Sequence, residues 1–211
     1  MTVAQTVAPV KMGGQPVPRL LDTTDLRSAL AQDLDGYFEQ LVLCYQNQLY
    51  TFALRIAGNP QDAEEIAQDA FVRAYRALAS YSPEQVQTLM LRAWLYQITL
   101  NIFRNRVRGQ RLKLVPLDDL GANAPEPAAD QQAEPEAIVA RAERERELSA
   151  VIARLPERYR VALVLRHVAG FGYGELAALL NQPVGTVKSN VHRGVELLRK
   201  ALDEPVEEVR S

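Results

Sequence analysis

Apolar residues recur every three or four positions through residues 38–56, 63–78 and 91–102. This spacing puts them on one face of a helix, so the sequence predicts three long amphipathic helices, with a shorter one near 24–30. Gly58-Asn59-Pro60 separates the first two, because glycine ends a helix, asparagine caps the next and proline suits its first turn. Residues 80–88 are expected to form a loop, since Ser82-Pro83 interrupts the pattern. The buried stripe of the third helix is expected to be Leu91, Trp94, Leu95, Ile98 and Ile102.

The last third of the chain predicts shorter helices. Segments 148–155, 156–169 and 173–180 each carry a brief apolar repeat, and Gly170 and residues 181–183 separate them. A longer helix is expected to start near Val184, and a short helix, a tight turn and a longer helix together make a helix-turn-helix. Its inner stripe is expected to be Val184, Val187, Val191, Val195 and Leu198. No segment alternates with period two for long enough to predict a strand, so the expected fold class is all-α.

Composition divides the chain into two small helical domains, a linker and two tails. Residues 1–21 contain proline and glycine without periodicity and predict a flexible N-terminal tail, followed by the first helical domain at 22–113. Residues 114–140 are rich in proline, alanine and acids and predict a flexible linker, because they have little to bury in return for ordering. The helix-turn-helix domain is expected at 141–203, with an acidic tail at 204–211.

The formal net charge of -2 conceals a sorted distribution of charges. Residues 37–115 carry nine basic and six acidic side chains, residues 116–147 carry three and nine, and residues 148–202 carry eight and three. Two basic blocks separated by an acidic one suggest two domains that each present a side to a polyanion. The alternative for the same charges is a set of solvated helix faces.

Two polar helix faces are candidates for binding nucleic acid. The third long helix carries Asn101, Arg104 and Arg108 at helical spacing, opposite its apolar stripe. The last helix carries residue types that contact phosphates and base edges, on the side away from its stripe. These residues are Thr186, Lys188, Ser189, His192 and Arg193. A helical hairpin without any role in DNA binding is the alternative.

Several classes of function are excluded by what the chain lacks. Cys44, His167 and His192 are its only soft metal ligands, so we expect no metal site and no disulfide. No nucleophile–base pair stands out, so we expect neither an enzyme nor a cofactor. No apolar run approaches 18 residues and no signal peptide is apparent, so the expected location is the cytoplasm.

Four segments resemble the extracytoplasmic-function (ECF) subfamily of bacterial sigma-70-type RNA polymerase sigma factors. Residues 62–75 (DAEEIAQDAFVRAY) are similar to the helix that binds core polymerase, and residues 94–101 (WLYQITLN) to the segment that reads the −10 element. Residues 155–160 (LPERYR) and 183–189 (PVGTVKS) are similar to the C-terminal DNA-binding domain. Their order and separations match the family, and so does a layout of two domains joined by a short linker.

The resemblance implies a function and a role for each candidate residue. The chain would be a transcription initiation factor, of the kind used in stress responses, that binds core RNA polymerase and recognises promoters. Docking on the clamp helices of the largest polymerase subunit would use Asp62, Glu65, Gln68 and Asp69. Melted −10 DNA would meet Asn101, Arg104 and Arg108. Duplex −35 DNA would meet Thr186, Lys188, Ser189, His192 and Arg193.

The resemblance also implies that an anti-sigma factor is a further partner, and that the acidic linker lies in the RNA exit path of the polymerase. Two other classes of protein remain as alternatives. One is a stand-alone helix-turn-helix regulator that binds a palindrome as a homodimer, and the other is an interaction protein that does not touch DNA. No dimerising stripe is visible for the first, and the exposed bases of the last helix argue against the second.

Overall fold

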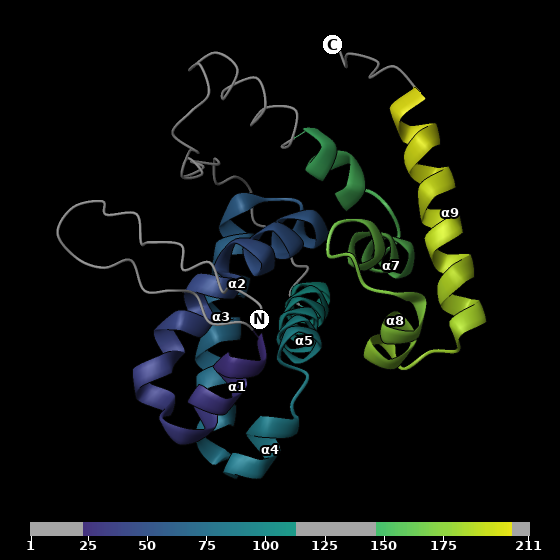
Figure 1. The fold of residues 1–211 in the computed structure, drawn as a ribbon. Helices are drawn as coiled ribbons and strands as arrows, with labels where there is room; N and C mark the ends of the chain where they lie inside the picture. The colour runs from purple at the N-terminus through teal and green to yellow at the C-terminus, as the bar shows by residue number, and fades with distance from the viewer. Residues whose placement is uncertain (1–22, 113–146, 204–211) are drawn as a thin grey trace, which may run out of the picture.

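The computed structural model describes residues 23–112 and 147–203, and these residues form helices and short connections without any strand (Figure 1). The expected all-α fold class is therefore confirmed for the described part of the chain. The first domain contains five helices, which are α1 (Thr23–Gln32), α2 (Leu34–Ala57), α3 (Pro60–Ser80), α4 (Pro83–Thr88) and α5 (Leu91–Leu112).

Caps at the junctions between helices fix where α2 and α3 begin and end. The side chain of Asp33 accepts a hydrogen bond from the backbone N–H of Gly36 at 2.9 Å and starts α2. Gly58 ends α2 in the left-handed conformation, with φ 87°. Asn59 then accepts from the backbone N–H of Asp62 at 2.8 Å, and Pro60 occupies the first turn of α3. The junction predicted from Gly58-Asn59-Pro60 is confirmed.

Residues 80–88 differ from the expected loop. Helix α3 continues to Ser80, and residues 83–88 form the one-and-a-half-turn helix α4. A capping box stabilises its start: Ser82 and Gln85 each accept a hydrogen bond from the backbone N–H of the other. The loop prediction was wrong because Ser82-Pro83 is a helix start as well as a helix breaker.

The second domain has the predicted helix-turn-helix. After a helical segment at 147–153, its helices are α7 (Glu157–His167), α8 (Tyr173–Leu180) and α9 (Val184–Asp203). Gly172 offers no side-chain cap to α8, but the carboxylate of Glu175 accepts from the Gly172 N–H at 2.7 Å. Asn181 ends α8 in the left-handed conformation, with φ 51°, and turns the chain into α9.

The buried stripes of α5 and α9 differ in part from the expected ones. On α9, Val187 and Val191 are buried and Val195 and Leu198 are half-buried, but Val184, the first residue of the helix, is 42% exposed. On α5, Trp94 and Ile98 are only half-buried, whereas Tyr96 is buried. The ring of Tyr96 packs on Phe52 of α2 and on Phe171 of the second domain, and a helical wheel of the first domain alone does not reveal the second of these contacts.

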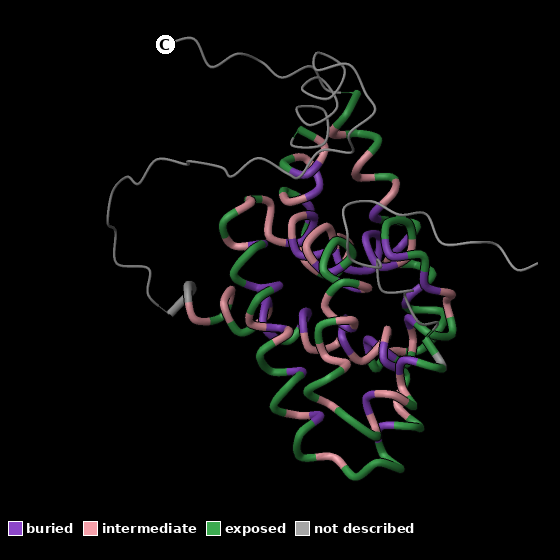
Figure 2. Tube along the Cα trace, turned by 60° about the vertical axis from the view of Figure 1, so that its left-hand side comes forward, coloured by how far each residue is buried: buried purple, intermediate pink, exposed green. Residues whose placement is uncertain are grey.

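The two domains are in direct contact, and their buried residues form one continuous cluster. Figure 2 shows buried positions in both domains. Helix α7 lies between α2 of the first domain and α9 of its own (Figure 1). Arg55 of α2 donates to the hydroxyl of Ser149 at 2.7 Å, and both side chains are buried. The ring of Tyr96 meets that of Phe171 edge-on, with centroids 5.0 Å apart. Nothing in the sequence pattern predicts this interface.

The remaining expectations about organisation fall outside the described residues. These are the flexible tail at 1–21, the acidic linker at 114–140 and the acidic tail at 204–211. Within the described helices, no stretch combines the length and the apolar character that a membrane span requires.

Candidate functional site

The four residues expected to bind polymerase lie on one side of α3. Glu65 and Gln68 are exposed, and Asp62 and Asp69 are partly exposed, while Ala63, Ile66, Ala67 and Ala70 of the same turns are buried. Gln68 donates to Glu64 at 3.1 Å. The three carboxylates all face Arg106, which projects from α5. The result is an acidic surface with one embedded arginine, suited to a basic partner.

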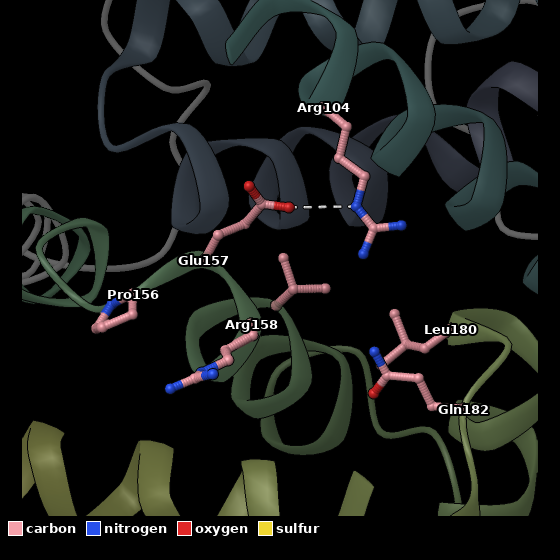
Figure 3. A pocket seen from close by; sticks show the side chains of 7 residues that line it. Arg104, Pro156, Glu157, Arg158, Leu180 and Gln182 are labelled. Carbon is pink, nitrogen blue, oxygen red and sulfur yellow. Dashed lines mark hydrogen bonds and ion pairs between the residues drawn. The ribbon is translucent and has the colours of Figure 1, made fainter. Parts of the chain in front are cut away.

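The three residues expected to bind the −10 strand are placed differently from one another on α5. Asn101 and Arg108 are exposed. Arg104 is partly buried, and its Nε donates to Glu157 Oε1 of the second domain at 3.2 Å (Figure 3). Asn101 and Arg108 are thus open to a ligand in this arrangement, whereas Arg104 is held in an ion pair between the domains.

An open pocket lies beside this ion pair, between α5 and the second domain (Figure 3). It has basic, acidic and apolar walls, formed by Arg104, Pro156, Glu157, Arg158, Val161, Leu180 and Gln182. Arg104 and Glu157 neutralise each other at its rim. The pocket exists only while the two domains are together, because each domain supplies part of its wall.

All five residues expected to read the −35 element are exposed on α9, and they are Thr186, Lys188, Ser189, His192 and Arg193. The opposite side of the helix packs on α7 and α8 through Val187 and Val191. The ammonium of Lys188 lies 5.7 Å from the centre of the Tyr173 ring, in the helix before the turn. The arrangement leaves one basic helix face free to enter a groove about as wide as a helix.

The sequence shows the acidic partners of some predicted basic residues and not those of others. Glu196 lies 3.0 Å from Arg193 and 3.7 Å from His192. Its positions at i+3 and i+4 signal such pairs in the sequence. Glu157, the partner of Arg104, has no comparable signal, because it is 53 residues away along the chain. The same holds for Arg106, which is 41 residues from Glu65.

Among residues 23–112 and 147–203, no group of three or more His, Cys, Asp or Glu side chains is arranged to hold a metal ion. Cys44 is partly buried, and this burial raises the pKa of its thiol. The candidate binding surfaces on α3, α5 and α9 consist of charged, amide and hydroxyl side chains on exposed helix faces.

Comparison with known proteins identifies the two domains. A model of sigma-70 region 2 matches residues 41–113, and a model of sigma-70 region 4 matches residues 145–198. The ECF RNA polymerase sigma factor SigW of Bacillus subtilis is 32% identical over 169 residues, which are 78% of this chain and 88% of SigW. The chain belongs to the ECF sigma factors. As a sigma factor it directs RNA polymerase to promoters for transcription initiation, and members of this family are not enzymes.

Two further relatives fit this assignment of an ECF sigma factor. The ECF sigma factor SigE of Mycolicibacterium smegmatis is 33% identical over 78% of this chain, which spans 61% of the length of SigE. The sigma factor RpoE of Bartonella quintana, solved in complex with the anti-sigma factor NepR, is similar with a TM-score of 0.59 and 26% identity. That match covers 78% of this chain and 96% of RpoE. The resemblance found in the four sequence segments is therefore confirmed.

Proposed function

We propose that this sigma factor uses three separate helix faces for its three tasks. The acidic face of α3 docks on core RNA polymerase, the polar face of α5 takes up the melted −10 strand, and the basic face of α9 enters the major groove of −35 DNA. The observation that carries the proposal is that every residue expected to read the −35 element lies exposed on α9. All five of these residues are exposed, while Val187 and Val191 on the opposite side are buried.

The proposed docking face on α3 suits a basic surface on the polymerase by its charge. Asp62, Glu65 and Asp69 place three carboxylates along one side of a single helix, with Gln68 between them. Half of the side chains of Glu65 and Asp69 is accessible, so both can form new bonds. Their charges also favour rapid association with a positively charged partner.

The proposed −10 contacts on α5 require one rearrangement. Asn101 is exposed and has both a donor and an acceptor, which a base lifted out of the stack can use. The Nε of Arg104 donates to Glu157 across the domain interface, and the charge of that carboxylate repels a phosphate from the neighbouring amino groups of the guanidinium. We therefore infer that the two domains move apart when the melted strand binds.

The proposed −35 contacts on α9 require only that one exposed ion pair opens, without any movement of the domains. Arg193 must turn from Glu196 toward DNA, and the two residues are exposed neighbours on one helix. Exposed ion pairs of this kind contribute about 0–1 kcal/mol, so the exchange costs little. Duplex DNA offers guanine edges and phosphates in return.

An anti-sigma factor is proposed as a further partner of this chain. RpoE of Bartonella quintana was solved with one. A protein that covers the α3 face would keep this sigma factor from polymerase. Recovery of the chain from its host alone and fully active would contradict this part of the proposal.

The experiment that tests the division of labour compares Arg193→Ala with Asn101→Ala. Each variant is assembled with core polymerase and bound to duplex promoter DNA and to promoter DNA that is already melted at −10. Arg193→Ala should weaken binding to the duplex by about 1–3 kcal/mol if it reads a base, and the melted template less. Asn101→Ala should leave duplex binding nearly intact and weaken capture of the melted strand.

Matched controls use exposed residues of the same types that lie off the proposed surfaces. Arg199→Ala removes one charge near the end of α9, and Asn47→Ala removes one amide on α2. Equal loss of duplex binding in both test variants would contradict the assignment. Binding of the chain to duplex DNA as a dimer, with no affinity for core polymerase, would instead support the stand-alone regulator.

A further inference from the structure

Arg106 differs from Arg104 and Arg108 of α5 in its direction and in its partners. It lies two residues from Arg104 and two from Arg108, which is about 200° around a helix in each case. It therefore faces α3, away from the side proposed to meet DNA. The sequence shows it only as one more base in a run free of acids from residue 85 to residue 117.

The guanidinium of Arg106 meets three carboxylates of α3. Its Nη1 lies 2.7 Å from Glu65 Oε2 and 3.6 Å from Asp62 Oδ1, and its Nη2 lies 3.4 Å from Asp69 Oδ2. Burial opposes the charge on Arg106, but the hydrogen bonds to Glu65 and Asp69 outweigh it and raise its pKa. Only 28% of its side chain is exposed, compared with about half for Glu65 and Asp69.

We propose that Arg106 is a positioning residue for polymerase binding, which holds Asp62, Glu65 and Asp69 as one ordered docking surface. The inference rests on the proposed function, in which these acids contact the polymerase. Arg106 itself need not touch the polymerase, since it approaches the acids from the α5 side and leaves about half of the Glu65 and Asp69 side chains and 35% of Asp62 exposed.

The physical reason is that the positive charge of Arg106 offsets the repulsion among the three carboxylates. Three carboxylates spaced by three and four residues lie along one side of a helix and repel one another. A planar guanidinium can bond two carboxylates in a fixed geometry, which a lysine ammonium cannot reproduce. Side chains that are already ordered lose less entropy when a partner binds them, so binding is tighter.

Arg106 also competes with the basic groups of the partner for the same carboxylates, which opposes tighter binding. The geometry favours positioning: all three contacts come from one side, and Glu65 and Asp69 remain half exposed to a second partner. A carboxylate can accept several hydrogen bonds, so Arg106 and a clamp residue can share it.

The test measures the affinity of the full chain for core polymerase in the absence of DNA. Arg106→Ala should weaken binding roughly fivefold to twentyfold, and Arg106→Lys should lose less, because it keeps the charge without the fork. Arg76→Ala is the matched control, since it removes an exposed charge near the far end of α3, and it should change affinity less than about twofold. Unchanged or tighter binding by Arg106→Ala would overturn the proposal.

A double-mutant cycle separates positioning from a structural role. Glu65→Gln is made alone and with Arg106→Ala, and if the arginine acts through Glu65, its removal should cost less in the Glu65→Gln background. Additive losses would overturn the proposal. Holoenzyme assembled at saturating Arg106→Ala protein should bind a single-stranded −10 oligonucleotide as tightly as the wild type. A loss at this step would make Arg106 a DNA contact and would overturn the proposal as well.

A different set of results would show that the α3 acids do not bind polymerase at all. If Glu65→Gln and a triple variant with Asp62→Asn and Asp69→Asn both bind polymerase like the wild type, the docking face itself is wrong, and the role of Arg106 falls with it. If the acidic variants weaken binding and Arg106→Ala does not, the docking face stands and only the inference fails.

Discussion

Gly194 lies where α9 packs on α7, and its lack of a side chain permits that contact. A Cβ at this position would lie 3.0 Å from the carbonyl oxygen of Tyr159 and 3.1 Å from Cβ of Leu163. Neither atom is the end of a flexible side chain, so the neighbouring backbone would have to shift. Glycine has a low propensity for helix interiors, but the buried position of Gly194 inside α9 has no room for a side chain.

Gly194→Ala should therefore destabilise the protein. Alanine gains about 0.5–1 kcal/mol in helix propensity, but overpacking against α7 costs about 1–3 kcal/mol, so the net loss should lie between about 0 and 2.5 kcal/mol. Gly185→Ala is the matched control on the same helix, because no atom lies within 4 Å of its added Cβ. Urea unfolding measures both variants, and a stabilised Gly194→Ala would contradict the close packing described here.

At the scale of residues, the sequence predicts which side chains are exposed better than it predicts their partners. All five candidate residues of α9 are exposed as expected, because the valine stripe defines the opposite side. Helical periodicity contains no information on Glu157, which reaches Arg104 from another domain. The functional roles of the candidate residues stay predictions until binding is measured.

At the scale of elements, strong caps and long apolar repeats made most helices predictable. Helix α8 spans the predicted residues 173–180, because Gly172 and Asn181 mark its two ends. Helix α4 was missed because six residues are too few to show a period. Its signal lies in the cap instead, where serine is followed by proline and, three residues on, by glutamine.

Ser82→Ala should loosen α4 by removing one half of its capping box. The backbone N–H of Gln85 would lose its acceptor, and N-cap substitutions of this kind cost about 0.5–2 kcal/mol. Ser80→Ala is the control, since the hydroxyl of Ser80 only donates to the carbonyl of Ala77 at 2.7 Å near the end of α3. Thermal unfolding should rank the two variants, and equal effects would show that the cap contributes nothing specific.

At the scale of the whole molecule, the contact between the two domains is the feature that the sequence does not predict. It joins residues that are far apart in the chain: Arg92 donates to the carbonyl of Ala169, 77 residues away, and stacks over the ring of Phe171. The sequence does not distinguish an arginine that covers an aromatic ring and bonds a carbonyl from an arginine that is exposed to solvent. A helical wheel drawn for each domain separately therefore gives no sign of the interface, although Tyr96 and Arg55 are buried and both contact the second domain.

Gly58 provides a test of this interface, because it has two constraints that can be separated by mutation. Its φ of +87° strains any residue with a side chain, at a cost of about 1–2 kcal/mol. Its added Cβ would also lie 2.4 Å from Cβ of Ala153 in the second domain, but 3.8 Å from its Cα. Gly58→Ala should therefore strain the end of α2 and push the domains apart. Adding Ala153→Gly should remove the clash and leave the strain.

The distance between two spin labels, one in each domain, measures the separation of the domains, while the melting temperature measures the strain. Labels at cysteines introduced for Arg76 and Arg199, both exposed and in different domains, require a Cys44→Ser background. Gly58→Ala should lengthen or broaden the distance distribution, and the added Ala153→Gly should restore it, while the melting temperature stays low in both. Cutting off Cβ of Ala153 costs helix propensity of about 1 kcal/mol, so recovery of the distance cannot come from a more stable helix. An unchanged distance in Gly58→Ala would show that the α2 end does not hold the domains together, and that Arg104 is not kept in its ion pair by this contact.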